Sequence, residues 1–337
     1  MLIEEHKPLR SFNTFGIDCK ARYFVSVDSI PNLKKVLSQE IHPTLFVLGA
    51  GSNILLTGDV DALVVHINLK GISIVSETDT VIRLQVMAGE DWHELVRYCV
   101  ANEYGGIENL SLIPGNVGTA PIQNIGAYGV ELNDVFVSCT AIEIETLKER
   151  TFNRSECEFG YRNSIFKKEE KGKYIITTVV LELSKTIHKI SASYGAIQEK
   201  LAENHIENPS INDISNAVIA IRQSKLPDPS QLGNSGSFFK NPELGAEAFK
   251  RFRSKHPTAP FYEVSVTQFK IPAAWLIEKA GFKGERSGDA GVHKMQALVL
   301  VNYGSASGSE IWELALRIQK KVKEDFGIFI EPEVNII

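Results

Sequence analysis

The segment from Ile113 to Gly129 limits the possible folds of this chain more than any other part of the sequence. It holds four glycines and two prolines, with small polar residues between them. Glycine and proline weaken helices and central strands, so neither element suits this segment. The segment is also too apolar for a solvated linker. We expect an ordered loop with a function, and an ordered loop that only connects two elements is the alternative.

A second glycine-bearing bend, Gly49–Asn53, follows Leu45–Leu48, which is typical of a strand. Backbone N–H groups in such bends can approach a phosphate closely, because glycine has no side chain in the way. The following stretch, Ile54–Gly58, is too short for the helix that a doubly wound dinucleotide-binding fold requires. The two glycine-rich bends together could hold a diphosphate through neutral donors, whereas the second bend alone could be a plain turn. The P-loop signature Gly-x-x-x-x-Gly-Lys-Ser/Thr does not occur.

Length and composition indicate an ordinary globular protein. The 337 residues suggest roughly two domains, or three small ones, and 43% of the residues are hydrophobic. The net charge of -5 argues against a nucleic-acid or anionic membrane partner and favours small molecules. No apolar run approaches the roughly 20 residues that cross a bilayer, and the acidic N-terminus does not resemble a signal peptide. We therefore expect a cytoplasmic protein.

The four cysteines form no Cys-x-x-Cys pair, so neither a zinc site nor a redox dithiol is indicated. We expect buried, reduced thiols and no bound metal.

The rest of the chain mixes strand and helix patterns, which indicates an α+β fold. A domain boundary is expected near the prolines at 227 and 229, and a glycine-rich loop at Gly233–Gly236. Strands are expected at 45–48, 62–67, 81–86, 136–144, 173–183 and 297–302. Helices are expected after Ser29 and at 91–102, 211–226, 273–280 and 309–326.

Ser237 lies between a glycine-rich turn and two aromatic residues. A hydroxyl held there in a mostly apolar pocket could act as a proton donor. No Gly-x-Ser-x-Gly elbow surrounds it, so a hydrolase nucleophile is a poor interpretation, and a helix-capping serine is the alternative.

Six motifs in this order closely resemble the UDP-N-acetylenolpyruvoylglucosamine reductase (MurB) family, also called UDP-N-acetylmuramate dehydrogenases. They are Asn13–Gly16, Leu48–Asn53, Ile113–Gly129, Tyr161–Ser164, Gly233–Pro242 and Glu331–Val334. The resemblance implies a two-subdomain FAD-binding fold of the vanillyl-alcohol-oxidase (PCMH) type, followed by a C-terminal α+β substrate-binding domain. It implies FAD-binding subdomains at 1–66 and 67–204 and a substrate-binding domain at 205–337, whose final strand returns Glu333 to the active site.

The family's activity is the reduction of an enolpyruvyl nucleotide sugar to UDP-N-acetylmuramate, a step of peptidoglycan precursor synthesis. The resemblance implies non-covalent FAD, NADPH as co-substrate, a ping-pong cycle and a monomer. Hydride addition to the vinyl carbon forces negative charge onto the α-carbon and the carboxylate, so the site needs a fixed cation and an acid.

The resemblance also assigns residues to roles. It gives Arg162 as the cation at the carboxylate, Glu333 as its partner and Ser237 as the proton donor. The residues that it implies for the substrate are Tyr161, Tyr194, Lys225, Asn241 and Gln296, with Tyr194 on a lid loop typical of the family's first type. Those that it implies for FAD are Gly49, Ala50, Gly51, Ser52, Asn53, Ser111, Pro114, Gly115, Gly118, Thr119, Gln123, Asn124, Gly126, Ala127, Tyr128 and Gly129.

Two of these roles have plain structural alternatives. Tyr194 could be an ordinary surface tyrosine, and Lys225 could be a lysine that interacts with the dipole at a helix C-terminus. Two other functions also remain open at this point. One is an FAD-dependent oxidase of a small alcohol, and the other is a nucleotide-sugar binding protein without redox activity.

Overall fold

The computed structural model describes residues 2–337, and the chain forms two compact units. The first unit contains residues 2–6, Arg22–Ala50 and Asp61–Ser224. The second contains Lys7–Ala21, Gly51–Val60 and Lys225–Ile337. Each unit is therefore built from three separate parts of the chain. The three domains expected from the resemblance, with boundaries after residues 66 and 204, stay a prediction.

A four-stranded sheet occupies one end of the first unit. Its strand order is β1 (Glu4–Pro8), β2 (Lys20–Val27), β5 (Val60–Ile67) and β3 (Leu45–Leu48), and β3 runs parallel to β5. Helix α1 (Ile30–Leu37) begins after Ser29, has a proline in its first turn and buries Leu33 and Val36. These two side chains join those of β2 and β5 in one hydrophobic core.

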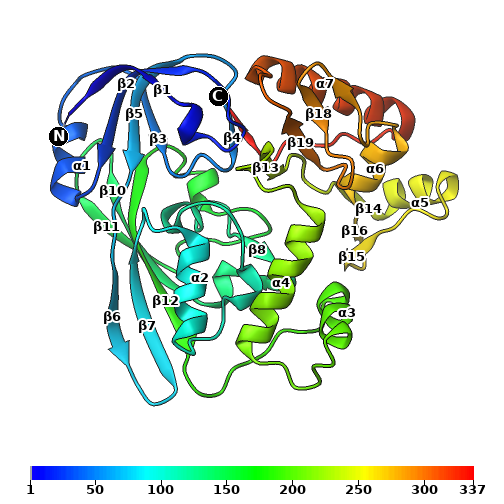
Figure 1. Ribbon diagram of the computed structural model, residues 1–337, viewed down its shortest axis with the longest axis horizontal. Coiled ribbons are helices and arrows are strands. Elements are labelled where there is room, and N and C mark those ends of the chain that lie inside the picture. Colours follow the sequence, from blue (N-terminus) through cyan, green and yellow to red (C-terminus); the bar gives the residue numbers. More distant parts are fainter. Residues whose placement is uncertain (1) are drawn as a thin grey trace. The chain divides into compact units, whose positions relative to one another are not determined.

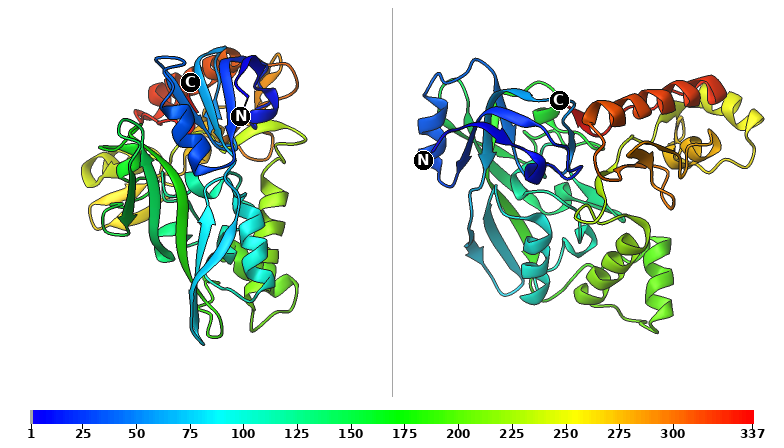
Figure 2. Two further views of the ribbon diagram at one scale, coloured as in Figure 1. Left: turned by 90° about the vertical axis from the view of Figure 1, so that its left-hand side faces the viewer. Right: turned by 45° about the horizontal axis from the view of Figure 1, so that its top comes forward.

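A five-stranded antiparallel sheet forms the centre of the first unit (Figure 1). Its order is β11 (Glu149–Asn153), β10 (Phe136–Glu143), β12 (Tyr174–Ser184), β7 (Val81–Met87) and β6 (Ile72–Glu77). Helix α2 (Trp92–Ala101) lies beside this sheet (Figure 2) and begins at Asp91, whose carboxylate accepts a hydrogen bond from the Glu94 backbone N–H. Buried Trp92, Leu95 and Cys99 share one core with the strands.

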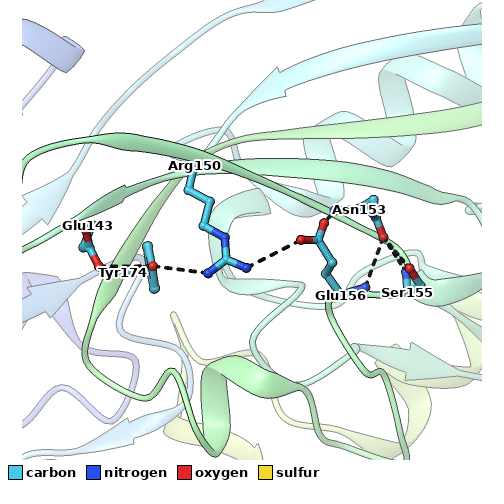
Figure 3. A network of polar contacts seen from close by, with 6 residues as sticks. All are labelled: Glu143, Arg150, Asn153, Ser155, Glu156 and Tyr174. Atoms are coloured by element: carbon cyan, nitrogen blue, oxygen red, sulfur yellow. Dashed lines mark hydrogen bonds and ion pairs between the residues drawn. The ribbon is translucent and has the colours of Figure 1, made fainter.

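A polar network braces the outer strands of this sheet (Figure 3). The Arg150 guanidinium donates to the Tyr174 hydroxyl at 3.5 Å and pairs with the Glu156 carboxylate at 3.5 Å. It also lies 4.2 Å from the centre of the buried Phe152 ring. The Tyr174 hydroxyl in turn donates to Glu143 at 3.3 Å. These contacts join β10, β11 and β12, and they involve none of the predicted site residues.

The remainder of the first unit carries the loops and two helices. Helices α3 (Gly195–Glu203) and α4 (Ile211–Lys225, of which residues up to Ser224 belong to this unit) lie side by side (Figures 1 and 2). Ile197 and Leu201 of α3 pack against Ile214 and Val218 of α4. The short elements are η2 (Glu108–Leu110), η3 (Val117–Thr119), β8 (Gly126–Ala127), β9 (Val130–Glu131), η4 (Leu132–Asp134) and η5 (Ile165–Lys167).

The second unit is built on a four-stranded sheet with helix α7 (Gly308–Phe326) against it. A capping box of Ser307 and Glu310 begins α7, and Gly327 ends it in the left-handed conformation that glycine favours. The sheet order is β13 (Gly233–Ser237), β19 (Val299–Asn302), β18 (Ala290–Val292) and β17 (Arg286–Ser287). The other elements are η1 (Arg10–Phe12), β4 (Ile54–Leu55), β14 (Glu243–Gly245), α5 (Ala246–Lys255), β15 (Tyr262–Ser265), β16 (Gln268–Lys270), α6 (Ala273–Lys279) and β20 (Asn335–Ile336).

The expectation of a loop at Gly233–Gly236 was wrong, because these residues belong to strand β13. Gly233 and Asn234 pair with Asn302 and Val301 of β19, and the register shifts before Ser237. Gly236 has a positive φ of 70° at this irregularity, which explains the glycine.

The expectation of buried, reduced thiols is confirmed, because all four cysteines are free and buried. Among residues 2–337, no helix combines the length and apolarity needed to cross a membrane.

Candidate active site

Within the first unit, Gly49 of one glycine-rich bend lies beside Thr119 of the other, although 70 residues of chain separate them. A β-carbon placed on Gly49 would come within 2.9 Å of Cγ2 of Thr119 and 4.0 Å of Cβ of Asn116. A β-carbon on Gly118 would likewise be 2.5 Å from that of Ala88. Glycine is therefore needed at both positions because of close packing.

Backbone hydrogen bonds fix the first half of the Ile113–Gly129 loop against the start of α2. The Trp92 N–H donates to the Gly115 carbonyl, and the Gly118 N–H donates to the Ala88 carbonyl, both at 2.9 Å. The Asn116 amide donates to the Gly89 carbonyl at 2.9 Å. The loop is thus ordered without being a regular element, as predicted. Pro114 belongs to this half.

Ser111, which was predicted to bind FAD, is fully buried just before this loop. Its hydroxyl donates to the Glu108 carbonyl at 2.6 Å and lies 2.8 Å from the Ser215 hydroxyl of α4. These two bonds give Ser111 a clear structural role, because they attach the loop to α4.

The second half of the loop contains non-glycine residues with left-handed backbone conformations. Asn124 and Tyr128 have φ values of 45° and 51°, and Arg162 in the neighbouring segment has 52°. Such values are uncommon outside glycine and tend to gather at functional sites. The fully buried Asn124 side chain is held by Glu131 at 2.7 Å and by the Gly160 carbonyl at 3.2 Å. This links the loop to the segment that carries Tyr161 and Arg162.

Arg162 contacts the glycine-rich loop directly. Its guanidinium donates to the Gly126 carbonyl at 2.5 Å and lies 5.4 Å from the centre of the Tyr161 ring. The Lys167 ammonium donates to the Gln123 side chain at 3.3 Å and to the Arg162 carbonyl at 3.4 Å. The structure therefore brings together a predicted catalytic cation and two residues predicted to bind FAD, Gly126 and Gln123.

Tyr194 immediately precedes α3, and its side chain is 46% exposed. Its ring packs edge-on against that of Tyr128, with the ring centres 5.2 Å apart and the planes at 88°. Ala127 and Gly129 flank Tyr128 in the chain, so Tyr194 contacts the part of the loop that was predicted to bind FAD.

In the second unit, the segments of Ser237 and Glu333 are neighbours. The Glu333 N–H donates to the carbonyl of Phe238 at 2.8 Å, and the Asn53 amide donates to the Glu333 carbonyl at 3.4 Å. Three predicted site residues, Ser237, Glu333 and Asn53, thus lie in adjoining backbone segments. Ser237 itself is exposed, whereas an apolar pocket was expected, although the adjacent Phe238 and Phe239 are buried.

The bend at Gly51–Asn53 is part of this second unit. A β-carbon on Gly51 would lie 2.0 Å from the Phe12 carbonyl oxygen, and φ at Gly51 is 64°. The Gly51 carbonyl accepts a hydrogen bond from the Thr14 N–H at 3.1 Å. Asn13–Gly16 therefore holds this end of the bend. Ala50 and Ser52, on either side of Gly51, are partly exposed.

The remaining predicted substrate residues also lie in the second unit. The Asn241 side-chain oxygen accepts the N–H of Ala273, so this asparagine caps α6. The Gln296 side-chain oxygen accepts the Leu298 N–H at 3.4 Å. Lys225 is the last residue of α4 and is exposed.

His93 and Tyr128 are two titratable groups of the first unit's site whose pKa values are clearly shifted. Partial burial lowers the pKa of His93, whose Nδ1 accepts the Leu112 N–H at 2.9 Å, and the neutral imidazole is therefore favoured. Partial burial raises the pKa of the Tyr128 hydroxyl, which stays protonated.

Arg222 of α4 lies near enough to Tyr128 to influence the pKa of its hydroxyl, and sequence reasoning missed it. Its position was a usable signal. Arg222 follows buried Val218 by four residues, so it lies at the edge of the buried stripe of this helix and is itself half-buried.

Two family models match the chain. The model of an FAD binding domain matches residues 22–146, and the model of the C-terminal domain of UDP-N-acetylenolpyruvoylglucosamine reductase matches residues 228–337.

Similar full-length proteins are also known. The UDP-N-acetylenolpyruvoylglucosamine reductase of Flavobacterium johnsoniae is 57% identical over 100% of both chains. The reductase of the same name from Pseudomonas putida is 46% identical over 99% of this chain and 98% of that one. The crystal structure of the UDP-N-acetylenolpyruvylglucosamine reductase (MurB) of Thermus caldophilus matches 100% of this chain and 99% of that chain, with a TM-score of 0.69 and 23% identity. The expectations of an α+β fold and of an FAD-binding portion are confirmed.

Proposed function

Because the chain belongs to the UDP-N-acetylenolpyruvoylglucosamine reductase family, we propose that it reduces UDP-N-acetylenolpyruvoylglucosamine to UDP-N-acetylmuramate, with FAD as cofactor and NADPH as co-substrate. It is an oxidoreductase of peptidoglycan precursor synthesis. The observation that carries the proposal is the contact between the two glycine-rich bends, at Gly49 and Thr119, within a chain that matches its relatives from end to end.

The residues at the two bends fit a dinucleotide cofactor. Glycines at positions 49 and 118 let the backbone pack closely, and the loop that follows is held rigidly by Asn116 and Asn124. Backbone N–H groups in such loops bind phosphates without a lysine or arginine. We infer that the sixteen residues predicted from the sequence hold FAD, which supplies the hydride-transfer chemistry when bound.

Arg162 is the group that we propose for the substrate carboxylate. Its bond to the Gly126 carbonyl fixes the guanidinium at the loop that binds the cofactor. A planar guanidinium suits a carboxylate and stabilises the negative charge that develops there in the transition state. Because this cation is already oriented by the protein, little reorganisation is needed when the charge develops.

Ser237 is the proposed proton donor to the α-carbon, and Glu333 is the proposed partner at the carboxylate. The bond from the Glu333 N–H to the Phe238 carbonyl sets the spacing of their two segments. A serine hydroxyl is a weak acid, so its contribution depends on position more than on pKa. The buried rings of Phe238 and Phe239 hold the backbone beside Ser237 in place.

For the rest of the substrate we propose Tyr161, Tyr194, Lys225, Asn241 and Gln296. Because the Asn241 side-chain oxygen already accepts the Ala273 N–H, its amide nitrogen is the group that would donate to substrate. Lys225 at the exposed end of α4 suits a phosphate.

The monomeric state, the cytoplasmic location and the lack of nucleic-acid and membrane partners stay predictions from the sequence. Light scattering on the purified protein would measure its mass in solution, and a dimer would contradict the first of them.

Anaerobic stopped-flow absorbance tests the proposed function directly. We expect the purified protein to bind FAD, NADPH to bleach the flavin absorbance, and the enolpyruvyl nucleotide sugar to restore it. A protein that stays colourless after incubation with FAD would support a binding protein without redox activity. Flavin that is reduced by a small alcohol and reoxidised only by oxygen would support an oxidase. Either result would overturn the proposal.

A further inference from the structure

The turn at Asn13–Gly16 in the second unit has no role in the proposed function, although it contacts two segments that do. Its shape is fixed from within by Asn13, whose side chain is 6% exposed. The Asn13 amide donates to the carbonyls of Leu9 at 2.8 Å and Ile17 at 3.0 Å, and its side-chain oxygen accepts the Ile17 N–H at 2.9 Å. A buried amide whose donors and acceptor are all used makes the turn rigid.

Thr14, the second residue of this turn, is bonded on one side to the bend at Gly51–Asn53. Its N–H donates to the Gly51 carbonyl at 3.1 Å, and its hydroxyl donates to the same oxygen at 3.4 Å. A β-carbon on Gly51 would lie 2.0 Å from the Phe12 carbonyl oxygen, so the two segments are as close as a glycine allows. Thr14 thus holds a part of the bend that we propose for FAD.

On its other side, Thr14 is bonded to strand β13. Its carbonyl accepts the Asn234 N–H at 3.0 Å, and its hydroxyl lies 3.4 Å from that of Ser235. Ser235 is 7% exposed, and its hydroxyl donates to the Ile54 carbonyl at 3.2 Å. Strand β13 ends at Ser237. One threonine therefore joins the bend to the strand that carries the proposed proton donor.

Phe15, the next residue of the turn, adds packing to this link. Its ring is 1% exposed and meets that of Phe238 edge-on, with the ring centres 6.3 Å apart. Its carbonyl accepts the Asn302 amide at 2.9 Å, and a β-carbon on Gly233 would lie 2.3 Å from the same oxygen. Phe238 directly follows Ser237, so the turn holds the backbone both before and after this serine.

We propose that Thr14 is a positioning residue of the active site. It sets the spacing between the Gly51–Asn53 bend and strand β13, and thereby the place of Ser237 relative to the cofactor that the bend binds. Such spacing matters because misplacing a reacting group by 1 Å can cost about 100-fold in rate. This inference rests on the proposed function, since it assumes that the bend binds FAD and that Ser237 donates the proton.

Thr14→Val tests the proposal, because it keeps the branched shape of the side chain and removes only the hydroxyl. With FAD saturating, we expect reduction of the flavin by NADPH to be nearly unchanged. Reoxidation by the enolpyruvyl nucleotide sugar should slow about threefold to tenfold, the effect of one lost hydrogen bond. D2O should slow reoxidation more in this variant than in the wild type, because transfer of the proton from Ser237 then limits the rate more strongly.

Two variants make this result specific. Thr14→Ser keeps the hydroxyl and should reoxidise its flavin nearly as fast as the wild type. Thr140→Val is the matched control, because Thr140 is also a half-buried threonine whose hydroxyl lies near another, that of Thr151 at 3.2 Å, on the outer strands of the first unit. This control should change neither half-reaction.

A double-mutant cycle tests whether Thr14 acts through Ser237. In a Ser237→Ala background, Thr14→Val should slow reoxidation no further. A full additional effect in that background, or equal slowing of both half-reactions in Thr14→Val alone, would overturn the proposal. A lower Tm of Thr14→Val with unchanged reoxidation would show a purely structural role and would overturn it as well.

Amide hydrogen exchange tests the structural link without substrate. We expect residues 233–237 to exchange faster in Thr14→Val than in the wild type or Thr14→Ser, and equal exchange in all three would contradict the link to β13. If the substrate fails to reoxidise the wild-type flavin, the proposed function falls and this inference falls with it. If the wild type completes both half-reactions and Thr14→Val matches it, this inference alone is refuted.

Discussion

Adding a single methyl group at Gly49 tests the central feature of the site. In Gly49→Ala, the new β-carbon would lie 2.9 Å from Cγ2 of Thr119, which is closer than carbon atoms pack in proteins. Thr119 is β-branched and its hydroxyl is bonded to the Asn116 carbonyl at 2.7 Å, so its side chain cannot simply rotate away. The two bends must then separate by a few tenths of an ångström.

Overpacking of this kind costs about 1–3 kcal/mol. If the two bends hold FAD together, that strain weakens cofactor binding, and the Kd of FAD should rise about fivefold to 150-fold. Titration of the flavin-free protein with FAD, followed by the quenching of flavin fluorescence, measures this Kd.

Two variants make the result specific. Thr119→Ser removes Cγ2 and keeps the hydroxyl, so Gly49→Ala combined with Thr119→Ser should bind FAD nearly as well as the wild type. Gly58→Ala places its methyl group in open space and should change nothing. Unchanged FAD binding in Gly49→Ala, or a double variant as weak as the single one, would refute the idea that both bends contact the cofactor.

The remaining predictions concern catalysis and pH. Ser237→Ala should leave reduction of the flavin by NADPH nearly intact and slow reoxidation by the substrate about 100-fold, and equal losses in both half-reactions would contradict its role as an acid. Arg162→Lys should lower turnover by about 100-fold, because ammonium does not reproduce the fixed guanidinium, and steady-state rates near those of the wild type would exclude it. The free energy of unfolding should fall as the pH drops below about 6.5, since the unfolded chain protonates His93 while the folded pKa is lower. Urea denaturation of wild type and His93→Gln between pH 8 and 5 measures this, and identical slopes would argue against it.

Local signals predicted many of the elements. The acidic cap at Asp91 and the glycine at 327 delimit α2 and α7 as the sequence indicated. Helix α3 was missed because it buries just two apolar residues, Ile197 and Leu201, and is stabilised by packing on α4. Strand β13 was missed because its glycines resemble a loop, and only pairing with the distant β19 makes it a strand.

The candidate site was likewise only partly predictable from local sequence patterns. Motif order identified the glycines at 49 and 118, but their packing depends on a contact between residues 70 positions apart, which no local pattern reports. Arg222 lies in no motif and is a single half-buried charge at the edge of an apolar stripe. Its relation to Tyr128 follows from how α4 packs against the loop.

The second unit is formed by separated parts of the chain, and this affects which fragments of the protein could fold by themselves. Strand β20, at the very end, pairs with β4, and Ile336 lies opposite Leu55. A fragment that starts at residue 225 would lack β4 and leave the edge of β20 without its backbone partner. During synthesis, the residues around Leu55 leave the ribosome long before their partners do. This pairing can therefore form only after residues 335 and 336 have been synthesised, and a chain cut before residue 335 would lack it.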